Sequence, residues 1–365
     1  MNKVLTVNEY TPDYIVTPGE VLEDHLENAG LSQASLAERT GLSKKTINEI
    51  VKAKSAITAE TALKFERTLG YPAHFWSNLE RQYQEDKTRF DDKKRLEKDL
   101  HWLEIFPVKE MIKYGWIEPI KEKTKQLAAL LQFFAVASPV QWETIWNRDL
   151  QAAFRKKEST QKDIAIISAW LRRGEIEAQE QQCAKFDKQK FQNSLDKISN
   201  LTLEDDPDIF VPKLKEICAN AGVAIVFVPA IKNLGIYGAT RWVNEKYIMQ
   251  LSMYGKSNDQ MWFTIFHEAC HIIYHSRNEL YVEGKGLDND KEKEADFFAS
   301  CSLIPQDELS QFLSYSSTPT IPQIKRFAAS IGIAPGIVVG RLQHEGVLPR
   351  NRGNDLKVWY EWEKN

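Results

Sequence analysis

The pattern of hydrophobic and polar positions divides this chain into segments of different texture. Residues 17–85 carry apolar positions at helical spacing in short runs, and residues 86–205 keep that spacing but are heavily charged. Further on, β-branched runs such as VAIVFV at 223–228 alternate with helical segments. We therefore predict an α+β fold that is mostly α. Its parts are an N-terminal arm (1–16), a five-helix domain (17–85), a helical connector (86–205) and a C-terminal domain with a small β-sheet (206–365).

The C-terminal part combines strand and helix patterns. The run RWVNEKYIMQLSMY at 241–254 predicts one strand, or two strands that meet around Asn244 and Glu245. The run MWFTIFHEACHIIYH at 261–275 predicts a helix that is apolar nearly all round, as a buried helix requires. A second helix over 291–304 ends at a proline, and further helical segments follow it. These further segments are 306–314 and 321–346.

The stretch from residue 18 to residue 70 carries the start and stop signals of four short helices. Pro18 suits the first turn of a helix, and Ser32 and Ser43 are candidate N-caps for the second and third helices. Gly41 permits a tight turn between those two helices. Two short helices joined by a tight turn are typical of a helix-turn-helix unit.

The third of these helices has the pattern of a DNA-recognition helix. Ile47, Ile50 and Val51 turn inward, which leaves the side chains at the start of the helix facing outward. In a helix-turn-helix, these N-terminal side chains reach base edges in the major groove, and neighbouring cations contact phosphates. The candidate DNA-contacting residues are Gln33, Lys44, Lys45, Thr46, Asn48 and Lys52.

Charge supports DNA binding only locally. The chain has 48 basic and 51 acidic residues, so its formal net charge of −3 does not indicate a nucleic-acid partner. Within the first 86 residues acidic side chains outnumber basic ones, and the basic side chains cluster at 44–54. A helical protein-interaction domain is therefore the alternative interpretation of residues 17–85.

The run HEACH, inside the helix predicted at 261–275, indicates a metal site. Two histidines four residues apart miss a common helix face by only about 40°. His267 and His271 can therefore bind one metal ion while Glu268 points to an open coordination position. The alternative is two buried histidines that are hydrogen-bonded to the backbone. We predict one zinc ion per chain, with Glu268 as the catalytic base.

A catalytic zinc needs a third protein ligand, which we expect from the helix over 291–304. Glu292 and Glu294 are candidates, and only one can face the metal because two residues turn a helix by about 200°. Glu292 shares its face with small residues that allow close helix packing, so we predict Glu292 as the ligand. Asp296 is predicted to accept the second N–H of a ligand histidine. The Glu-x-x-x-Asp spacing resembles that of gluzincin peptidases and implies a zincin-like domain.

Two further predictions concern the surroundings of the metal. His275 continues the spacing of four but lies roughly 80° from the axis through His267. We expect His275 on the flank or on the substrate side rather than as a ligand. The glycines of GIYGATRW at 235–242 would permit close backbone approach, so we expect this segment to pair with an extended peptide substrate as an edge strand.

The sequence predicts a cytoplasmic protein without a membrane partner. The N-terminus lacks the basic start and apolar stretch of a signal peptide, and no run approaches the roughly 18 apolar residues of a membrane span. The cysteines are scattered and form no CxxC, which favours a reduced interior. They are Cys183, Cys218, Cys270 and Cys301.

The motifs of both functional regions resemble known families. Within residues 17–85, the segments PGEVL, LSQASLAERTGLSKKTINEI, ITAETALKFERTLG and FWSNLERQYQ resemble the HigA-type antitoxin branch of the Xre helix-turn-helix family. Within residues 206–345, the segments FTIFHEACHIIYH, EKEADFFASCSLIP and IAPGIVVGRLQHEG resemble the ImmA/IrrE family of metallopeptidases. This second resemblance implies that both histidines of HEACH and Glu292 bind zinc, with Glu268 as the base.

The two resemblances together imply a regulatory role. The HigA-type branch binds its own promoter, commonly as a homodimer, and often neutralises a cognate toxin. ImmA/IrrE peptidases cleave repressors of mobile elements or stress regulons. We therefore hypothesise a DNA-binding transcriptional regulator with a zinc endopeptidase domain, whose partners are operator DNA and a protein substrate or toxin. Two alternatives are an antitoxin or autorepressor whose zinc domain binds a partner without proteolysis, and an enzyme whose helix-turn-helix docks on a protein.

Overall fold

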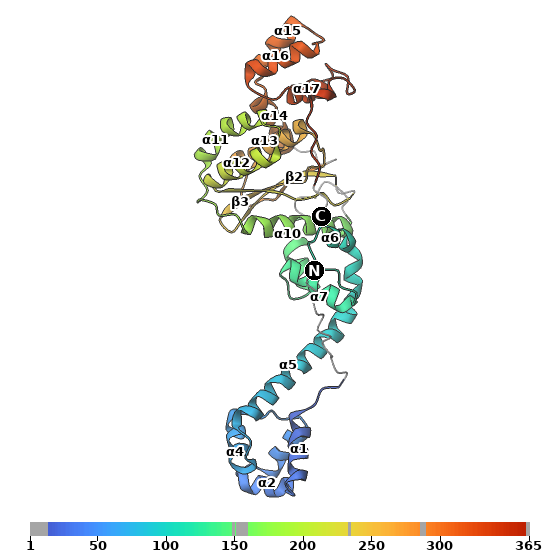
Figure 1. The fold of residues 1–365 in the computed structure, drawn as a ribbon, viewed down its shortest axis with the longest axis vertical. Coiled ribbons are helices and arrows are strands. Elements are labelled where there is room, and N and C mark those ends of the chain that lie inside the picture. Colours follow the sequence, from blue (N-terminus) through green and yellow to red (C-terminus); the bar gives the residue numbers. More distant parts are fainter. Residues whose placement is uncertain (1–13, 148–149, 151–159, 233–234, 285–289, 363–365) are drawn as a thin grey trace, which may run out of the picture. The chain divides into compact units, whose positions relative to one another are not determined.

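The chain divides into two compact units, Met1–Asp99 and Leu100–Asn365, in the computed structural model (Figure 1). The N-terminal arm predicted at 1–16 lies almost wholly outside the described residues. Within the part of the chain that the structure describes, no helix has both the length and the apolar character of a membrane span. The described residues are 14–147, 150, 160–232, 235–284 and 290–362.

Among its described residues, the first unit contains five helices, as predicted. Thr17 and Glu20 form a capping box at the start of α1, in which each side chain accepts the backbone N–H of the other residue. Ser32 and Ser43 cap α2 and α3, and Gly41 ends α2 with a φ of 68°. The helices are α1 (Pro18–Asn28), α2 (Gln33–Thr40), α3 (Lys44–Val51), α4 (Ala59–Leu69) and α5 (Ala73–Lys98).

One small core holds these helices together. Ile47 is fully buried and Ile50 is nearly so, while Val51 is only half-buried at the end of α3. Gly19 allows α1 to pack closely on α3, because a Cβ there would collide with the carbonyl oxygens of Ile50 and Val51. The side chains that are completely buried in this core are Leu22, Leu36, Ile47, Ala62, Phe65 and Trp76.

The second unit begins with a series of helices that leads to a β-sheet. One of them, α10, packs directly on the sheet: Trp170 donates its indole N–H to the carbonyl of Val228 at 3.1 Å, and Gln250 donates to the carbonyl of Trp170 at 2.7 Å. The helices before the sheet are η1 (Leu100–Ile105), α6 (Val108–Lys113), α7 (Lys123–Phe134), α8 (Pro139–Trp142), η2 (Glu143–Asn147), α10 (Gln161–Gln179), α11 (Lys188–Asn200), η3 (Leu201–Leu203) and α12 (Pro207–Asn220).

The sheet has four strands in the order β1-β3-β2-β4. Strand β1 runs parallel to β3, and the other pairs are antiparallel. Strands β2 and β3 form a hairpin whose turn is Asn244-Glu245, with φ values of 49° and 64°. The two-strand interpretation of this region is therefore correct, although the first strand begins earlier than predicted. The strands are β1 (Val223–Phe227), β2 (Ile236–Val243), β3 (Lys246–Leu251) and β4 (Tyr281–Gly284).

The prediction that residues 235–242 form a free edge strand is wrong. Strand β2 lies between β3 and β4, and β4 pairs with it from Ile236 to Thr240. A strand that is paired on both sides cannot accept an added peptide strand. The prediction failed because β4 has only four residues and lacks the alternation of apolar and polar residues from which a strand is predicted.

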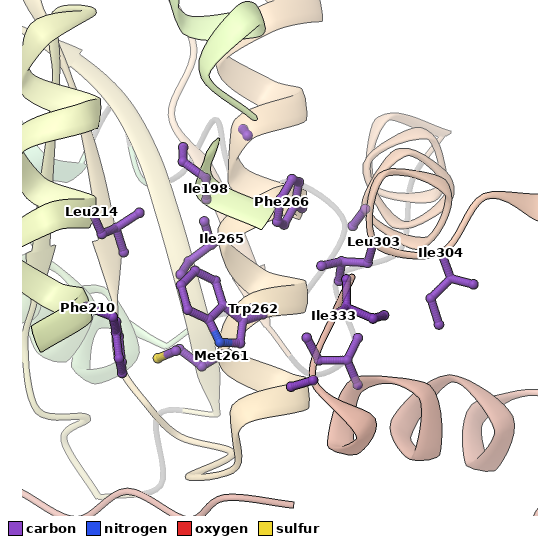
Figure 2. Close-up of a cluster of buried hydrophobic side chains, with 14 of the residues drawn as sticks. Ile198, Phe210, Leu214, Met261, Trp262, Ile265, Phe266, Leu303, Ile304 and Ile333 are labelled. Atoms are coloured by element: carbon purple, nitrogen blue, oxygen red, sulfur yellow. The ribbon is translucent and has the colours of Figure 1, made fainter. Parts of the chain in front are cut away.

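The helix that carries HEACH lies at the centre of the second unit. Helix α13 (Asn258–Tyr274) is buried on nearly all sides, and Trp262, Ile265 and Phe266 belong to the main core (Figure 2). Gly332, with a φ of 73°, ends α16, so the segment predicted at 321–346 forms two helices. The helices that follow α13 are α14 (Asp290–Leu303), α15 (Gln306–Tyr315), α16 (Ile321–Ile331), α17 (Pro335–His344) and η4 (Asn354–Leu356). The predicted class, mostly helical with a small sheet, is confirmed.

Candidate metal centre and helix-turn-helix surface

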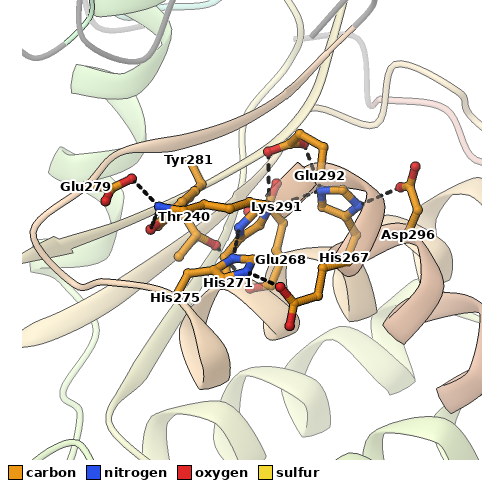
Figure 3. A network of polar contacts seen from close by, with 11 residues as sticks. Thr240, His267, Glu268, His271, His275, Glu279, Tyr281, Lys291, Glu292 and Asp296 are labelled. Carbon is orange, nitrogen blue, oxygen red and sulfur yellow. Dashed lines mark hydrogen bonds and ion pairs between the residues drawn. The ribbon is translucent and has the colours of Figure 1, made fainter. Parts of the chain in front are cut away.

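The close packing of α14 on α13 creates the candidate metal centre. Ala295 and Ala299 of α14 are completely buried, and such small side chains let the two helix backbones approach. This packing brings Glu292 to the two histidines of α13 (Figure 3). The exposed fractions are 1% for His267, 0% for His271 and 7% for Glu292, so the three polar side chains are buried together.

The three side chains present their donor atoms to one point. Nε2 of His267 lies 3.2 Å from Oε2 of Glu292 and 3.1 Å from Nε2 of His271. Nε2 of His271 lies 3.5 Å from Oε1 of Glu292. All the donor atoms fall within 4.8 Å of one another, so the group could hold a metal ion. Two imidazoles and one carboxylate are the ligand set of several catalytic zinc sites, and the residues therefore fit this metal.

Each histidine also has an outer partner. Nδ1 of His267 lies 2.9 Å from Oδ1 of Asp296, which is the contact expected for that residue. Nδ1 of His271 lies 2.7 Å from Nδ1 of His275. Nε2 of His275 lies 3.2 Å from Oε2 of Glu294. The two glutamates that were candidates for the third ligand thus have different partners. Glu292 contacts His267 and His271, whereas Glu294 contacts His275.

The electrostatics of the two donor histidines differ. Burial lowers the pKa of His267, but its hydrogen bonds to Asp296 and Glu292 outweigh burial and raise the pKa well above the ordinary value. Burial lowers the pKa of His271 to about 2. His271 is therefore a neutral imidazole, which is the protonation state that a metal ligand requires.

Glu268 sits against the sheet beside these donors. Its exposed fraction is 0%, and neither of its carboxylate oxygens has a close hydrogen-bond partner among the described residues. Burial raises its pKa well above the ordinary value. A Cβ at Gly238 of β2 would lie 2.5 Å from Oε1 of Glu268, so only glycine leaves room for this carboxylate. A buried carboxylate with a raised pKa is suited to accept and return a proton.

Strand β4 adds a carboxylate that the sequence did not predict. Glu283 forms a second group of potential donors with His267 and Glu268. Burial raises the pKa of Glu283 to about 7. Nothing in the sequence marked this residue, because its position depends on the pairing of β4 with β2.

A cavity of about 770 Å³ adjoins the centre within the second unit. Residues of α13, β4, α14, α17 and the C-terminal segment line it. Glu283 and Asp296 belong both to this wall and to the surroundings of the donor atoms. Phe297 and Trp359, with exposed fractions of 68% and 59%, add apolar surface to the wall. The volume is in the range of sites that bind sizeable ligands.

The candidate DNA-contacting residues lie on α3, directly after it and at the start of α2. Lys44, Lys45, Asn48 and Lys52 are exposed. Thr46 is half-buried, and its backbone N–H donates to Oγ of Ser43 at 3.0 Å. Gln33 is half-buried at the first position of α2. The outer face of α3 is therefore polar and partly basic, whereas its inner face is apolar.

Comparison with known families separates the same two regions. Residues 22–76 match the family model for a helix-turn-helix, and residues 219–338 match the peptidase-family model described as an IrrE N-terminal-like domain. The chain joins a helix-turn-helix domain to an IrrE N-terminal-like domain. The candidate DNA-contacting residues fall in the first domain, and all the candidate metal donors fall in the IrrE N-terminal-like domain.

Individual relatives each match about a fifth to a quarter of the chain. Virulence-associated protein I of Dichelobacter nodosus is 42% identical over 69 residues, which are 19% of this chain and 64% of that protein. A HigA-family addiction module antidote protein from Coxiella burnetii is 28% identical, covers 23% of this chain and 92% of its own, and has a TM-score of 0.21. The Pseudomonas aeruginosa antitoxin HigA, solved with the higBA promoter, is 31% identical, with coverages of 23% and 94% and a TM-score of 0.22.

Proposed function

We propose that this chain is a DNA-binding transcriptional regulator with a zinc-dependent endopeptidase domain. Its peptidase would cleave a repressor or partner protein in a stress, mobile-element or toxin–antitoxin circuit. The observation that carries the proposal is the convergence of His267, His271 and Glu292 next to the buried carboxylate of Glu268, inside an IrrE N-terminal-like domain. A purely structural zinc site would need no such additional carboxylate beside its ligands.

The donor set supports zinc as the metal. His267, His271 and Glu292 would hold one ion and leave one coordination position for water. Zinc bound there would supply a Lewis acid that activates water near neutral pH and polarises the scissile carbonyl group. The hydrogen bond to Asp296 holds the ring of His267 in the orientation that turns Nε2 inward.

Glu268 carries the proton transfer in this proposal. It follows His267 directly in the chain, so its carboxylate emerges beside the donor atoms. Its buried position favours the uncharged form, so Glu268 can hold the proton taken from water and deliver it to the leaving amine. Gly238 leaves the space that the carboxylate needs for this role.

The neighbouring cavity supports a polypeptide substrate. It extends from Glu283 and Asp296 along α14 to the C-terminal segment, so a chain lying in it would pass the metal donors. Phe297 and Trp359 offer contacts for apolar side chains. Since β4 occupies the edge of β2, we place the substrate in this cavity rather than on that edge.

The peptidase proposal is tested with Glu268→Gln in the full chain. Wild-type protein loaded with zinc is expected to cleave members of a library of quenched fluorescent peptides. Glu268→Gln should retain zinc and lose cleavage by about 10²–10⁴-fold, which is the range for a general acid–base residue. Glu308→Gln, at an exposed position of α15, is the matched control and should cleave normally. Equal cleavage by Glu268→Gln and wild type would remove the catalytic role.

The DNA-binding half is tested separately on the region upstream of the gene. Lys44→Ala with Lys45→Ala should weaken binding to this DNA by about 1–3 kcal/mol for each lost base contact. Lys64→Ala is the control, because Lys64 lies on α4 and pairs with Glu60 at 2.9 Å. Unchanged DNA affinity in the double variant would favour docking of the helix-turn-helix on a protein.

One observation favours a second candidate function. The candidate donors and Glu268 are almost completely buried, so the second domain could bind a partner, such as a cognate toxin, without turnover. The chain would then be an antitoxin or autorepressor, as the HigA-type resemblance implies. Glu268→Gln separates the two, because this function predicts that the variant retains full repression and full partner binding. Loss of regulation in that variant would favour the peptidase.

A further inference from the structure

Two residues at the metal centre have no part in the proposed catalysis. His275 follows the last residue of α13, and only 5% of its side chain is exposed. Glu294 lies on α14 with 59% of its side chain exposed. One lies at the end of α13 and the other on α14, yet His275 contacts both His271 and Glu294. Their contact therefore joins an exposed carboxylate to a buried imidazole that itself contacts His271.

The positions of the protons follow from the contacts. Nε2 of His271 faces His267 and Glu292 at 3.1 and 3.5 Å, so it must present a lone pair if a metal is to bind there. The hydrogen of the neutral ring then sits on Nδ1, which lies 2.7 Å from Nδ1 of His275. Nδ1 of His275 must therefore be the acceptor, and its own ring hydrogen must sit on Nε2.

The last contact completes this assignment. Nε2 of His275 lies 3.2 Å from Oε2 of Glu294, so its N–H donates to a carboxylate. Each ring nitrogen of His271 and His275 then has one defined role, and none of the assignments conflict. The same partner type serves His267 directly, because Asp296 lies 2.9 Å from its Nδ1. Asp296 thus contacts the donor His267 directly, whereas Glu294 is linked to the donor His271 through the imidazole of His275.

We infer that His275 and Glu294 are positioning residues that fix the tautomer and the ring orientation of His271. This inference rests on the proposed metal function of the same site. Carboxylates that support metal-bound histidines typically account for 10–100-fold in metal affinity. The contacts from Glu294 to His275 and from His275 to His271, here called the relay, give His271 such support. No carboxylate of α14 contacts Nδ1 of His271 directly.

The geometry of α14 explains why an intervening imidazole is needed. Residues 292 and 294 differ by about 200° around a helix, so their side chains leave on nearly opposite sides. Glu292 turns to the donor atoms, and Glu294 reaches only the flank that His275 occupies. Tyr281 of β4 stacks on the His271 ring at 4.4 Å between centroids with an interplanar angle of 17°. The stacked ring restrains the tilt of His271, and the relay restrains its rotation.

The test measures zinc affinity in the full chain by competition with a chromophoric chelator. His275→Phe keeps a ring but offers no acceptor, and it should weaken zinc binding 10–100-fold. His275→Gln restores a carbonyl oxygen that can accept the N–H of His271, so it should recover part of the loss. Tyr274→Phe, at a half-exposed neighbouring position, is the matched control and should bind zinc as the wild type does.

Glu294 provides a second variant that does not disturb the core. Glu294→Ala should weaken zinc binding less than His275→Phe, because the bond between His271 and His275 remains. Nitrogen NMR of the zinc-loaded protein should show the His271 hydrogen on Nδ1 in the wild type and a mixture of tautomers without zinc in His275→Phe. A purely structural role for His275 would change thermal stability but not the tautomer.

The results of these zinc-binding measurements distinguish a failure of the relay from a failure of the metal centre. Wild-type zinc affinity in both His275→Phe and Glu294→Ala, together with a loss in Glu292→Ala, would overturn the relay and leave the metal centre intact. A wild-type chain that binds no zinc would overturn both. A loss of zinc affinity in His275→Phe, a smaller loss in His275→Gln and no loss in Tyr274→Phe support the relay.

Discussion

The helix-turn-helix domain and the IrrE N-terminal-like domain place their candidate functional side chains in opposite surroundings. In the first domain these side chains come from one continuous stretch of α2 and α3, and four of them are exposed. In the second they come from two helices, and the contact between His267 and Glu292 spans 25 residues of sequence. DNA binding and folding can therefore be altered separately in the first domain. In the second domain the candidate metal donors are themselves buried, so a substitution at the metal site also changes the buried interior.

The largest effect is expected from Glu292→Ala. The substitution removes one of three donors and leaves two buried imidazoles together, so zinc affinity should fall by more than the roughly 10–100-fold typical of outer partners. DNA binding should not change, because the helix-turn-helix domain does not contain the donor. Chelator competition and an electrophoretic mobility shift assay measure the two properties. Asp290→Ala, an exposed change in the same helix, should alter neither property, and an equal loss of zinc in that control would refute the assignment.

A core substitution in the first domain is expected to have the next largest effect. Ile47→Ala removes a fully buried side chain beneath the outer face of α3, and it should lower the free energy of unfolding of that domain by about 2–5 kcal/mol. Zinc content should stay at the wild-type level. Urea unfolding followed by circular dichroism provides the measurement. Leu63→Ala, at a position that is 46% exposed, should cost far less, and equal costs would contradict the described core.

A smaller effect is expected at the start of α1. Thr17→Ala removes the side chain that accepts the backbone N–H of Glu20, so the helix-turn-helix domain should lose about 1 kcal/mol of stability. Thr17→Ser keeps the hydroxyl group and should restore most of the loss. Thermal unfolding of the two variants is the measurement. If both were equally destabilised, the effect would not come from the cap.

The smallest effect is expected from the loss of one surface cation. Lys52 is exposed just after α3, where a contact with a DNA phosphate would fall. Lys52→Ala should reduce the slope of log affinity against log salt by about 1 in magnitude and weaken all DNA sequences equally. Fluorescence anisotropy at several salt concentrations measures that slope. A sequence-dependent loss would mean that Lys52 reads bases instead.

The sequence predicted those features that depend on local structure. Ser32, Ser43 and Gly41 are local signals, and the structure places them at helix ends as expected. The spacing of His267 and His271 defines one helix face without knowledge of the rest of the fold. The prediction of Glu292 rested on small residues on its side of α14, and the structure brings Glu292 to the histidines. Its role as a ligand stays a prediction until metal is measured.

The features that sequence reasoning missed depend on long-range packing. Strand β4 has four residues, and only its pairing with β2 makes it a strand. Without β4, the segment at 235–242 was mistaken for an edge, and Glu283 was not recognised as a neighbour of the metal donors. The contact between His275 and Glu294 joins two helices whose relative rotation the sequence does not specify.

X-ray absorption at the zinc edge, on full-length protein loaded with zinc, tests the central claim most directly. The account predicts one zinc per chain with two imidazole nitrogens and at least one carboxylate oxygen as ligands, and no sulfur, although Cys270 lies within the HEACH run. The absence of bound zinc after loading, or a sulfur ligand in the absorption spectrum, would contradict it.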